Sequence, residues 1–162
     1  MKRNKRGFTL IEMVFVILIG SILTGIALSS FQNVQARMAV RGAKQVYMTW
    51  HQRARSRAIE TGETVAMIVY PQGDSAKLLT MINGLPEWTD LQRFDEELGV
   101  DLRARGNADF QLCMTPRGFA DHDCGSFPAA MQQTYTDTVR LEFWLNADSA
   151  SVLILPMGQL IG

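Results

Sequence analysis

The chain has 162 residues, 47% of them hydrophobic and 20% charged, a balance typical of a folded domain rather than a disordered segment. The formal net charge of zero hides a segregation, because the part from Glu60 onward carries 15 acidic and six basic side chains, a formal charge of −9. That C-terminal part lacks the basic face expected of a non-specific nucleic-acid-binding domain.

The first predicted element is a membrane-spanning helix. Four basic residues within positions 2–6 precede an apolar run from Phe8 to Phe31, whose only charged side chain is Glu12. As a helix this run would be about 36 Å long, enough to cross a hydrocarbon core of about 30 Å. An ordinary cleavable signal would have a shorter apolar region followed by a small-residue cleavage site, and neither is present. We therefore expect the apolar helix to be retained.

The carboxylate of Glu12 is the unusual feature of this helix. A lone charge in hydrocarbon is costly, so the side chain must be neutral or paired, and an acid inside a membrane segment is a functional candidate.

The stretch KRGFTLIEM, residues 5–13, resembles the processing site of type IV prepilins and pseudopilins. In that family an inner-membrane prepilin peptidase cuts after the glycine and methylates the new N-terminal amine. The resemblance implies cleavage between Gly7 and Phe8, with N-methylated Phe8 as the first mature residue. The alternative is an uncleaved signal anchor in which Glu12 has no special role.

Cleavage would supply a partner for Glu12. The amine of Phe8 in one subunit can lie near Glu12 of a neighbour, and at about 4 Å with an effective dielectric constant of about 20 the attraction is about 4 kcal/mol. Such pairing would set the axial register of assembly. Pairing of Glu12 with its own N-terminus, or protonation of Glu12, remains open.

The helix is predicted to continue beyond the membrane to about Thr61, with Gly62 as its C-cap, because no proline occurs before Pro71. Apolar residues recur at three- and four-residue spacing and form one core-facing stripe: Ala36, Ala39, Val40, Ala43, Val46, Tyr47, Trp50, Ala54 and Ala58. A basic flank lies beside the stripe and consists of Arg37, Arg41, Lys44 and Arg55. It faces either anionic lipid headgroups or the acidic head of a neighbouring subunit.

After Gly62 the pattern predicts a β-rich head, and hence an α+β fold in which a long N-terminal helix packs on that head. Two strands at 64–70 and 77–82 are joined by a Pro-Gly-Asp turn, and Asn-Gly at 83–84 marks another reversal. Residues 85–98 are expected to form an irregular acidic connection with one helical turn. Further strands are expected near 110–114, 138–145 and 151–155.

Cys113 and Cys124 are the only cysteines. A head exported to an oxidising periplasm would bridge them, and the closed loop would contribute about 3 kcal/mol. Residues 121–124, Asp-His-Asp-Cys, suggest a metal site as an alternative, but ligands this close in sequence rarely converge on one ion.

No catalytic constellation, cofactor site or metal set is predicted. His51 lies near the packing stripe and is expected to be a hydrogen-bonded interface residue rather than a base. Ser56, Ser75 and Ser126 have no nucleophile motif around them.

Residues 53–73 resemble the helix end and first hairpin of the H-type minor pseudopilins and FimT-type minor pilins. The tail ILPMGQLIG also fits their outline. Some DNA-uptake pilins of this group carry basic residues in the tail, but here Gln159 is uncharged and no Lys or Arg follows Arg140. This composition argues against DNA binding through the tail.

The resemblance implies four segments: a leader at 1–7, a transmembrane half-helix at 8–31, an amphipathic half-helix at 32–61 and a periplasmic head at 62–162. It implies a minor structural subunit of a type II secretion pseudopilus or type IV pilus, held in the bacterial inner membrane. The implied partners are prepilin peptidase, other pilins or pseudopilins, the inner-membrane assembly platform and membrane lipid. The alternatives are a tip pilin that binds DNA or exported protein, and a membrane-tethered enzyme, which the missing nucleophile, metal set and phosphate loop disfavour.

Overall fold

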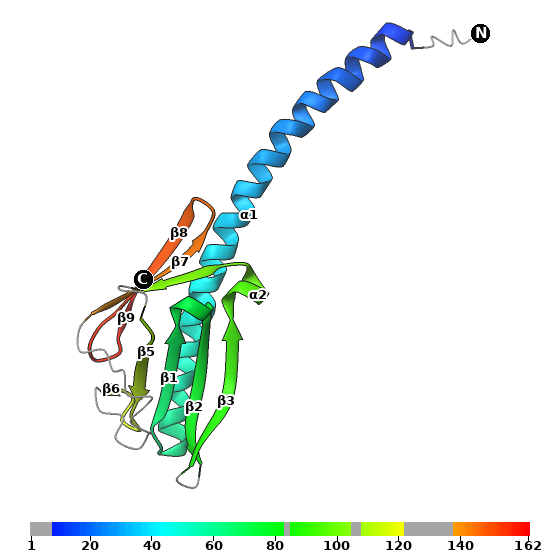
Figure 1. Cartoon of the computed structure of the whole chain (residues 1–162). Coiled ribbons are helices and arrows are strands. Elements are labelled where there is room, and N and C mark those ends of the chain that lie inside the picture. Colours follow the sequence, from blue (N-terminus) through cyan, green and yellow to red (C-terminus); the bar gives the residue numbers. More distant parts are fainter. Residues whose placement is uncertain (1–7, 83–84, 105–107, 122–137) are drawn as a thin grey trace, which may run out of the picture. The chain divides into compact units, whose positions relative to one another are not determined.

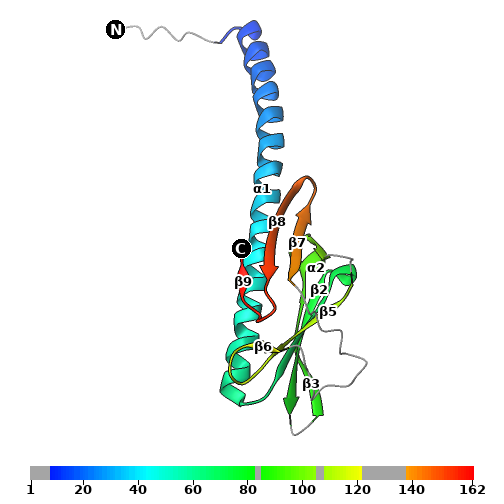
Figure 2. The same ribbon diagram turned by 90° about the vertical axis from the view of Figure 1, so that its left-hand side faces the viewer.

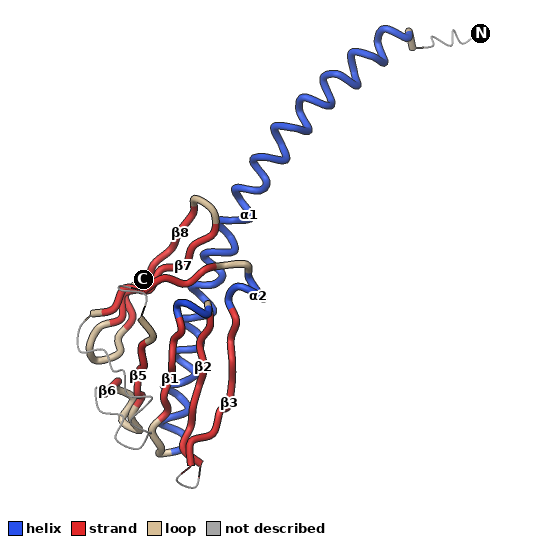
Figure 3. Tube along the Cα trace, in the orientation of Figure 1, coloured by secondary structure: helices blue, strands red, loops and turns tan. Residues whose placement is uncertain are grey.

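The protein has an α+β fold, seen in a computed structural model that describes residues 8–82, 85–104, 108–121 and 138–162. In these ranges a long helix, α1 (Leu10–Thr61), precedes nine strands, which pair antiparallel, and a short second helix (Figures 1 and 3). The chain divides into two compact units, Met1–Gln35 and Ala36–Gly162.

In the first unit, α1 is mostly apolar and those of its side chains that the structure describes are exposed. An 18-residue window of the helix has a mean hydropathy of 2.4, none of it buried, and is long and apolar enough to cross a membrane. No proline interrupts the helix. No described residue of the chain buries this apolar window of α1.

In the second unit, one side of α1 is buried, as the apolar spacing predicts. Its buried apolar residues are Ala36, Val40, Ala43, Tyr47, Trp50, Ala54 and Ala58. Small alanines flank two aromatic side chains, so the strands approach the helix closely while Tyr47 and Trp50 fill the space between. The Tyr47 ring lies 5.9 Å from that of Phe143, which also packs 5.8 Å from Phe94. Figure 2 shows the strands gathered on one side of this part of α1.

The larger sheet has the strand order β3-β2-β1-β5-β6. Its strands are β1 (Val65–Tyr70), β2 (Ser75–Ile82), β3 (Leu85–Arg93), β5 (Phe110–Met114) and β6 (Ala120–Asp121). The face toward α1 contributes Met67, Leu78 and Leu112 to the main core. The other face is also buried, and we call it the second face: Ala66, Ile68, Leu79, Gln111 and Cys113.

The smaller sheet has the order β4-β7-β8-β9. Its strands are β4 (Asp101–Ala104), β7 (Val139–Leu145), β8 (Asp148–Ile154) and β9 (Leu160–Ile161). Leu141 and Phe143 of β7 are buried while Arg140 is exposed, the alternation of a sheet with one face on the core. The strands predicted near 110–114, 138–145 and 151–155 correspond to β5, β7 and β8.

The expectation for residues 85–98 is half wrong. Residues Leu85–Arg93 form a nine-residue strand, β3, and only Phe94–Leu98 form the expected helical turn, α2. β3 is the edge strand of the larger sheet, where a proline and charged side chains are tolerated and where charges discourage pairing with another chain. Because of Pro86 and the acidic residues, the sequence pattern did not indicate this strand.

The predicted turns are confirmed where the structure describes them. Gly62 has a positive φ of 68°, and its N–H donates to the Ala58 carbonyl at 3.1 Å, which ends α1. The turn after β1 is the 3₁₀ helix η1 (Pro71–Gly73), followed by Asp74 in a left-handed conformation with φ 43°. Antiparallel pairing places Ile82 opposite Leu85, as a reversal at 83–84 requires, although those two residues lie outside the described ranges.

Candidate functional site

The start of α1 carries two of the predicted site residues, Phe8 and Glu12. Thr9 precedes the helix, and its hydroxyl oxygen accepts a hydrogen bond from the Glu12 N–H at 3.3 Å, while its carbonyl accepts from the same N–H at 3.1 Å. This is the N-cap contact that Thr-x-x-Glu sequences make, so the sequence TLIE at 9–12 fixes the first helical turn. Glu12 also lies in the turn where a carboxylate stabilises the helix dipole.

Both predicted residues are exposed in the single chain. Phe8 is 72% exposed, and the Glu12 carboxylate makes no hydrogen bond or ion pair with a described residue. Gly7, the other half of the predicted cleavage site, lies outside the described ranges. The geometry leaves the Glu12 carboxylate accessible to a group from outside the chain, and the pairing with Phe8 of a neighbour stays a prediction.

The basic flank partly contacts its own head. Arg37 Nε donates to Asp148 Oδ1 at 3.2 Å, and Asp148 begins β8. Arg41, Lys44 and Arg55 form no ion pair with a described residue, so they stay available to lipid or to a second subunit. Lys44 lies beside Gly162, next to β9.

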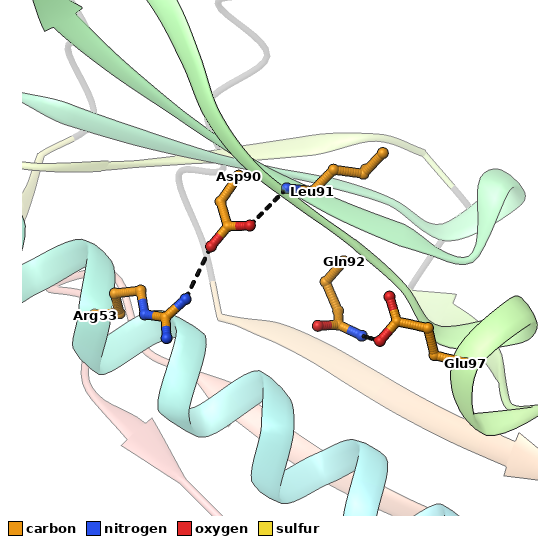
Figure 4. A network of polar contacts seen from close by, with 5 residues as sticks. All are labelled: Arg53, Asp90, Leu91, Gln92 and Glu97. Atoms are coloured by element: carbon orange, nitrogen blue, oxygen red, sulfur yellow. Dashed lines mark hydrogen bonds and ion pairs between the residues drawn. The ribbon is translucent and has the colours of Figure 1, made fainter.

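A second helix–sheet ion pair was not anticipated from the sequence. Arg53 Nη1 of α1 donates to Asp90 Oδ2 at 2.8 Å, and the other Asp90 oxygen accepts from the Leu91 N–H at 3.2 Å (Figure 4). On the same strand, Gln92 Nε2 donates to Glu97 Oε2 of α2 at 2.6 Å. These contacts connect the edge strand β3 to α1 and α2. Both partners of the ion pair are more than one third exposed, so its contribution to stability is small.

Asp74 is a further residue that sequence reasoning missed. Its carbonyl accepts from the Phe94 N–H at 2.8 Å, and its side-chain Oδ1 accepts from the Leu102 N–H. The residue thereby connects the β1–β2 turn to α2 and to β4 of the other sheet. Burial raises the pKa of its carboxyl group, and the Leu102 hydrogen bond opposes that rise. The available signal was the Asp in a Pro-x-Gly-Asp turn, where left-handed backbone is common.

His51 is buried, as predicted, with 4% of its surface exposed. Burial, and secondarily the charge of Arg55, lowers its pKa from 6.5 to about 4, although a hydrogen bond with the Gly158 backbone opposes that fall. Its Nε2 has no hydrogen-bond partner among the described residues, so the expected hydrogen bonding is met at the Gly158 backbone but not at Nε2. A neutral imidazole held this way packs the helix against the β8–β9 turn.

Cys113 lies on the second face of the larger sheet, away from α1. Gln111 Nε2 lies 3.2 Å from its Sγ. Cys124, and with it His122, Asp123 and Ser126, falls outside the described ranges, so the Cys113–Cys124 bridge and the alternative metal site both stay untested. Of the remaining serines considered, Ser56 is exposed on α1 and Ser75 is buried at the start of β2.

The outer face of the smaller sheet carries a polar cluster around Glu142. One carboxylate oxygen accepts from Trp144 Nε1 at 3.0 Å, and the other pairs with Arg140 Nε at 3.0 Å. The guanidinium of Arg103 lies over the Trp144 ring, 4.8 Å from its centroid. Each of these side chains contacts another of the cluster, as in an ordinary solvated sheet face.

The comparisons with known proteins bear on the N-terminal segment. Residues 2–28 match the family model described as the prokaryotic N-terminal methylation motif. No curated protein and no solved structure matches the chain. The motif supports a type IV pilin-like protein that is processed by prepilin peptidase and assembles with other pilins, and with the apolar helix it supports membrane anchoring. It favours a structural subunit over an enzyme.

Proposed function

We propose that the chain is a minor pilin or pseudopilin, a structural subunit of a type II secretion pseudopilus or a type IV pilus. The observation that carries this proposal is the methylation motif at residues 2–28. Its apolar part forms the exposed beginning of α1. A helix of that kind needs lipid or other apolar helices around it. Filament assembly supplies both in turn, lipid before incorporation and neighbouring helices afterwards.

The segments follow from this proposal. Residues 1–7 are the leader, 8–31 the transmembrane half of the helix, 32–61 its amphipathic half and 62–162 the periplasmic head. Prepilin peptidase cuts between Gly7 and Phe8 and methylates the Phe8 amine. The inner-membrane assembly platform then extracts the subunit from the bilayer, and oxidation in the periplasm closes the Cys113–Cys124 bridge.

The minor and H-type assignment is supported by the sequence of residues 53–73, and the tail ILPMGQLIG fits the same outline. The structure contributes a compatible outline, in which the helix ends at Gly62 and is followed directly by the β1–β2 hairpin. Quantitative mass spectrometry of sheared filaments tests the minor role. A chain that dominated those filaments would be a major subunit, and this part of the proposal would be wrong.

The decisive experiment for the proposed function is N-terminal mass analysis of protein extracted from membranes. We expect a chain that begins at Phe8 and carries one added methyl group on its amine. The control is a Gly7→Leu variant, which should accumulate with its leader attached because the peptidase requires the glycine. A wild-type chain that retains Met1, or that begins near Ser30, would exclude prepilin processing.

A further inference from the structure

A hollow of about 190 Å³ lies between α1 and the start of β8, within the unit Ala36–Gly162. Its walls come from two turns of the helix and from the start of β8. The lining residues are Arg37, Val40, Arg41, Asp148, Ser149 and Ala150.

The hollow contains hydrogen-bond donors that the described protein does not use. Arg37 is held in place by Asp148, with Nε to Oδ1 at 3.2 Å. Arg41, one helical turn further on, forms no hydrogen bond or ion pair with a described residue, and neither does the Ser149 hydroxyl. Two guanidinium groups and one carboxylate leave a net positive charge. The chemistry of the hollow therefore suits a compact anion with several acceptor oxygens, such as a phosphate.

The position of these residues along α1 indicates where the anion comes from. The proposed transmembrane half ends at residue 31, and Arg37 follows Phe31 by only six residues. Six residues of chain reach at most about 20 Å, so Arg37 lies within that distance of the end of the apolar run. Headgroup layers are about 5 to 8 Å thick on each side, and a long arginine side chain can extend toward them.

We propose that this hollow binds the phosphate group of an anionic phospholipid in the leaflet on the head's side of the membrane. Arg41 and Ser149 donate hydrogen bonds to the phosphate oxygens, and Asp148 orients Arg37 beside them. The inference rests on the proposed function, because it requires α1 to be inserted in a bilayer. A recess that presents several donors fits a headgroup better than the broad acidic surface of a neighbouring subunit.

The test is native mass spectrometry of the full chain, delipidated in mild detergent and titrated with dioleoyl phosphatidylglycerol. We expect Arg41→Gln combined with Ser149→Ala to lower the lipid-bound fraction about tenfold, as the loss of a charged hydrogen bond implies. The matched control is Arg57→Gln, which removes the same charge from the same helix outside the hollow and should change binding less than twofold. The substitutions leave residues 1–7 unchanged, so any contribution of the leader's basic residues is the same in each variant at equal cleavage. Because Arg41 and Ser149 are exposed, the near-ultraviolet circular dichroism should be unchanged.

Three results would overturn the inference. The first is equal lipid retention by the double variant and the control. The second is displacement of the lipid by an equal concentration of glycerol 3-phosphate, which would make the hollow a site for soluble phosphate. The third is unchanged lipid retention with reduced recovery of pilin partners, which would assign Arg41 to a neighbouring subunit. Cleavage after Gly7, measured on the same samples, tests the proposed function separately, because the titration does not depend on processing.

Discussion

His51 is a buried side chain whose protonation depends on folding. Its pKa is about 4 in the folded protein against an ordinary value of 6.5, chiefly because burial disfavours the imidazolium. Between those two values the unfolded chain binds more protons than the folded one. The stability of the fold therefore falls as the pH falls from 6.5 to about 4, by at most about 3 kcal/mol from this residue.

We predict that His51→Gln flattens this pH dependence. Urea unfolding of the compact unit Ala36–Gly162 at pH 7, 5.5 and 4 would give the free energies of unfolding. The difference between wild type and variant should shrink as the pH falls, since only the wild type must keep a histidine uncharged. Asp74 contributes with the opposite sign, because its raised pKa favours the folded state toward lower pH, but it is present in both proteins and cancels. Parallel curves for the two proteins would contradict the prediction.

Asp74 gives a second prediction at the scale of one residue. Asp74→Ala removes the acceptor for the Leu102 N–H and places a residue without a local hydrogen bond at φ 43°, so we expect a loss of about 2 to 3 kcal/mol. Asp74→Asn keeps a side-chain oxygen and tolerates left-handed backbone, and it should cost less than about 1 kcal/mol. Chemical denaturation of both variants at pH 7 provides the comparison. Equal losses would show that the Leu102 contact contributes little.

At the scale of elements, the β8–β9 turn depends on a close approach of two backbones. A Cβ at Gly158, where φ is 73°, would lie 2.5 Å from the Ala120 Cβ and 3.2 Å from the Ala120 nitrogen. That contact places the turn against β6, and the Ala120 N–H donates to the Met157 carbonyl at 3.2 Å. The two sheets meet there through the last strand of each.

We predict that Gly158→Ala destabilises the unit by about 3 kcal/mol, from left-handed strain and from the collision with Ala120. Gly99→Ala is the matched control, because Gly99 has a similar φ of 64° and open space around its Cβ position. Its cost should be about 1 kcal/mol, the strain alone. Thermal unfolding measures both, and a smaller loss at Gly158 than at Gly99 would contradict the close contact between the two sheets.

Periodicity predicted the elements that bury a regular face. The stripe on α1 and the apolar runs of β1 and β5 carry their own signal, because hydrophobic spacing reports directly on burial. β3 carried no such signal in its sequence, because an edge strand accepts a proline and acidic side chains. β6 and β9 have two residues each, and their pairing depends on contacts such as that of Gly158 with Ala120.

The contacts of the candidate site likewise divide into those that the sequence could predict and those that it could not. The TLIE cap and the position of Glu12 are local features and could be predicted from adjacent residues. The ion pairs of α1 could not, because Arg53 and Asp90 are 37 residues apart and Arg37 and Asp148 are 111 apart. Only the arrangement of the sheets brings those partners together.

At the scale of the whole molecule, Glu12 is predicted to serve assembly rather than stability. Glu12→Gln should leave cleavage after Gly7 nearly intact while lowering incorporation into filaments, because a neighbour's Phe8 amine loses its partner, worth about 4 kcal/mol at an effective dielectric constant of about 20. The variant should also remain in the bilayer as a monomer, since it no longer buries a charge. Co-purification of processed subunit with its filament partners, at matched expression, measures the effect. Equal recovery of wild type and variant would favour self-pairing or a protonated Glu12.

The buried stripe of α1 also has a consequence for the order of folding. Residues 36–61 precede every strand in the chain, so the helix that completes the core is synthesised first and its apolar side waits for partners. Contacts of α1 with β7 and β8 span about a hundred residues, and such distant closures slow folding. The strands are therefore synthesised after the helix on which they pack. Until β8 has been synthesised, the apolar stripe of α1 is exposed and can aggregate or bind a chaperone.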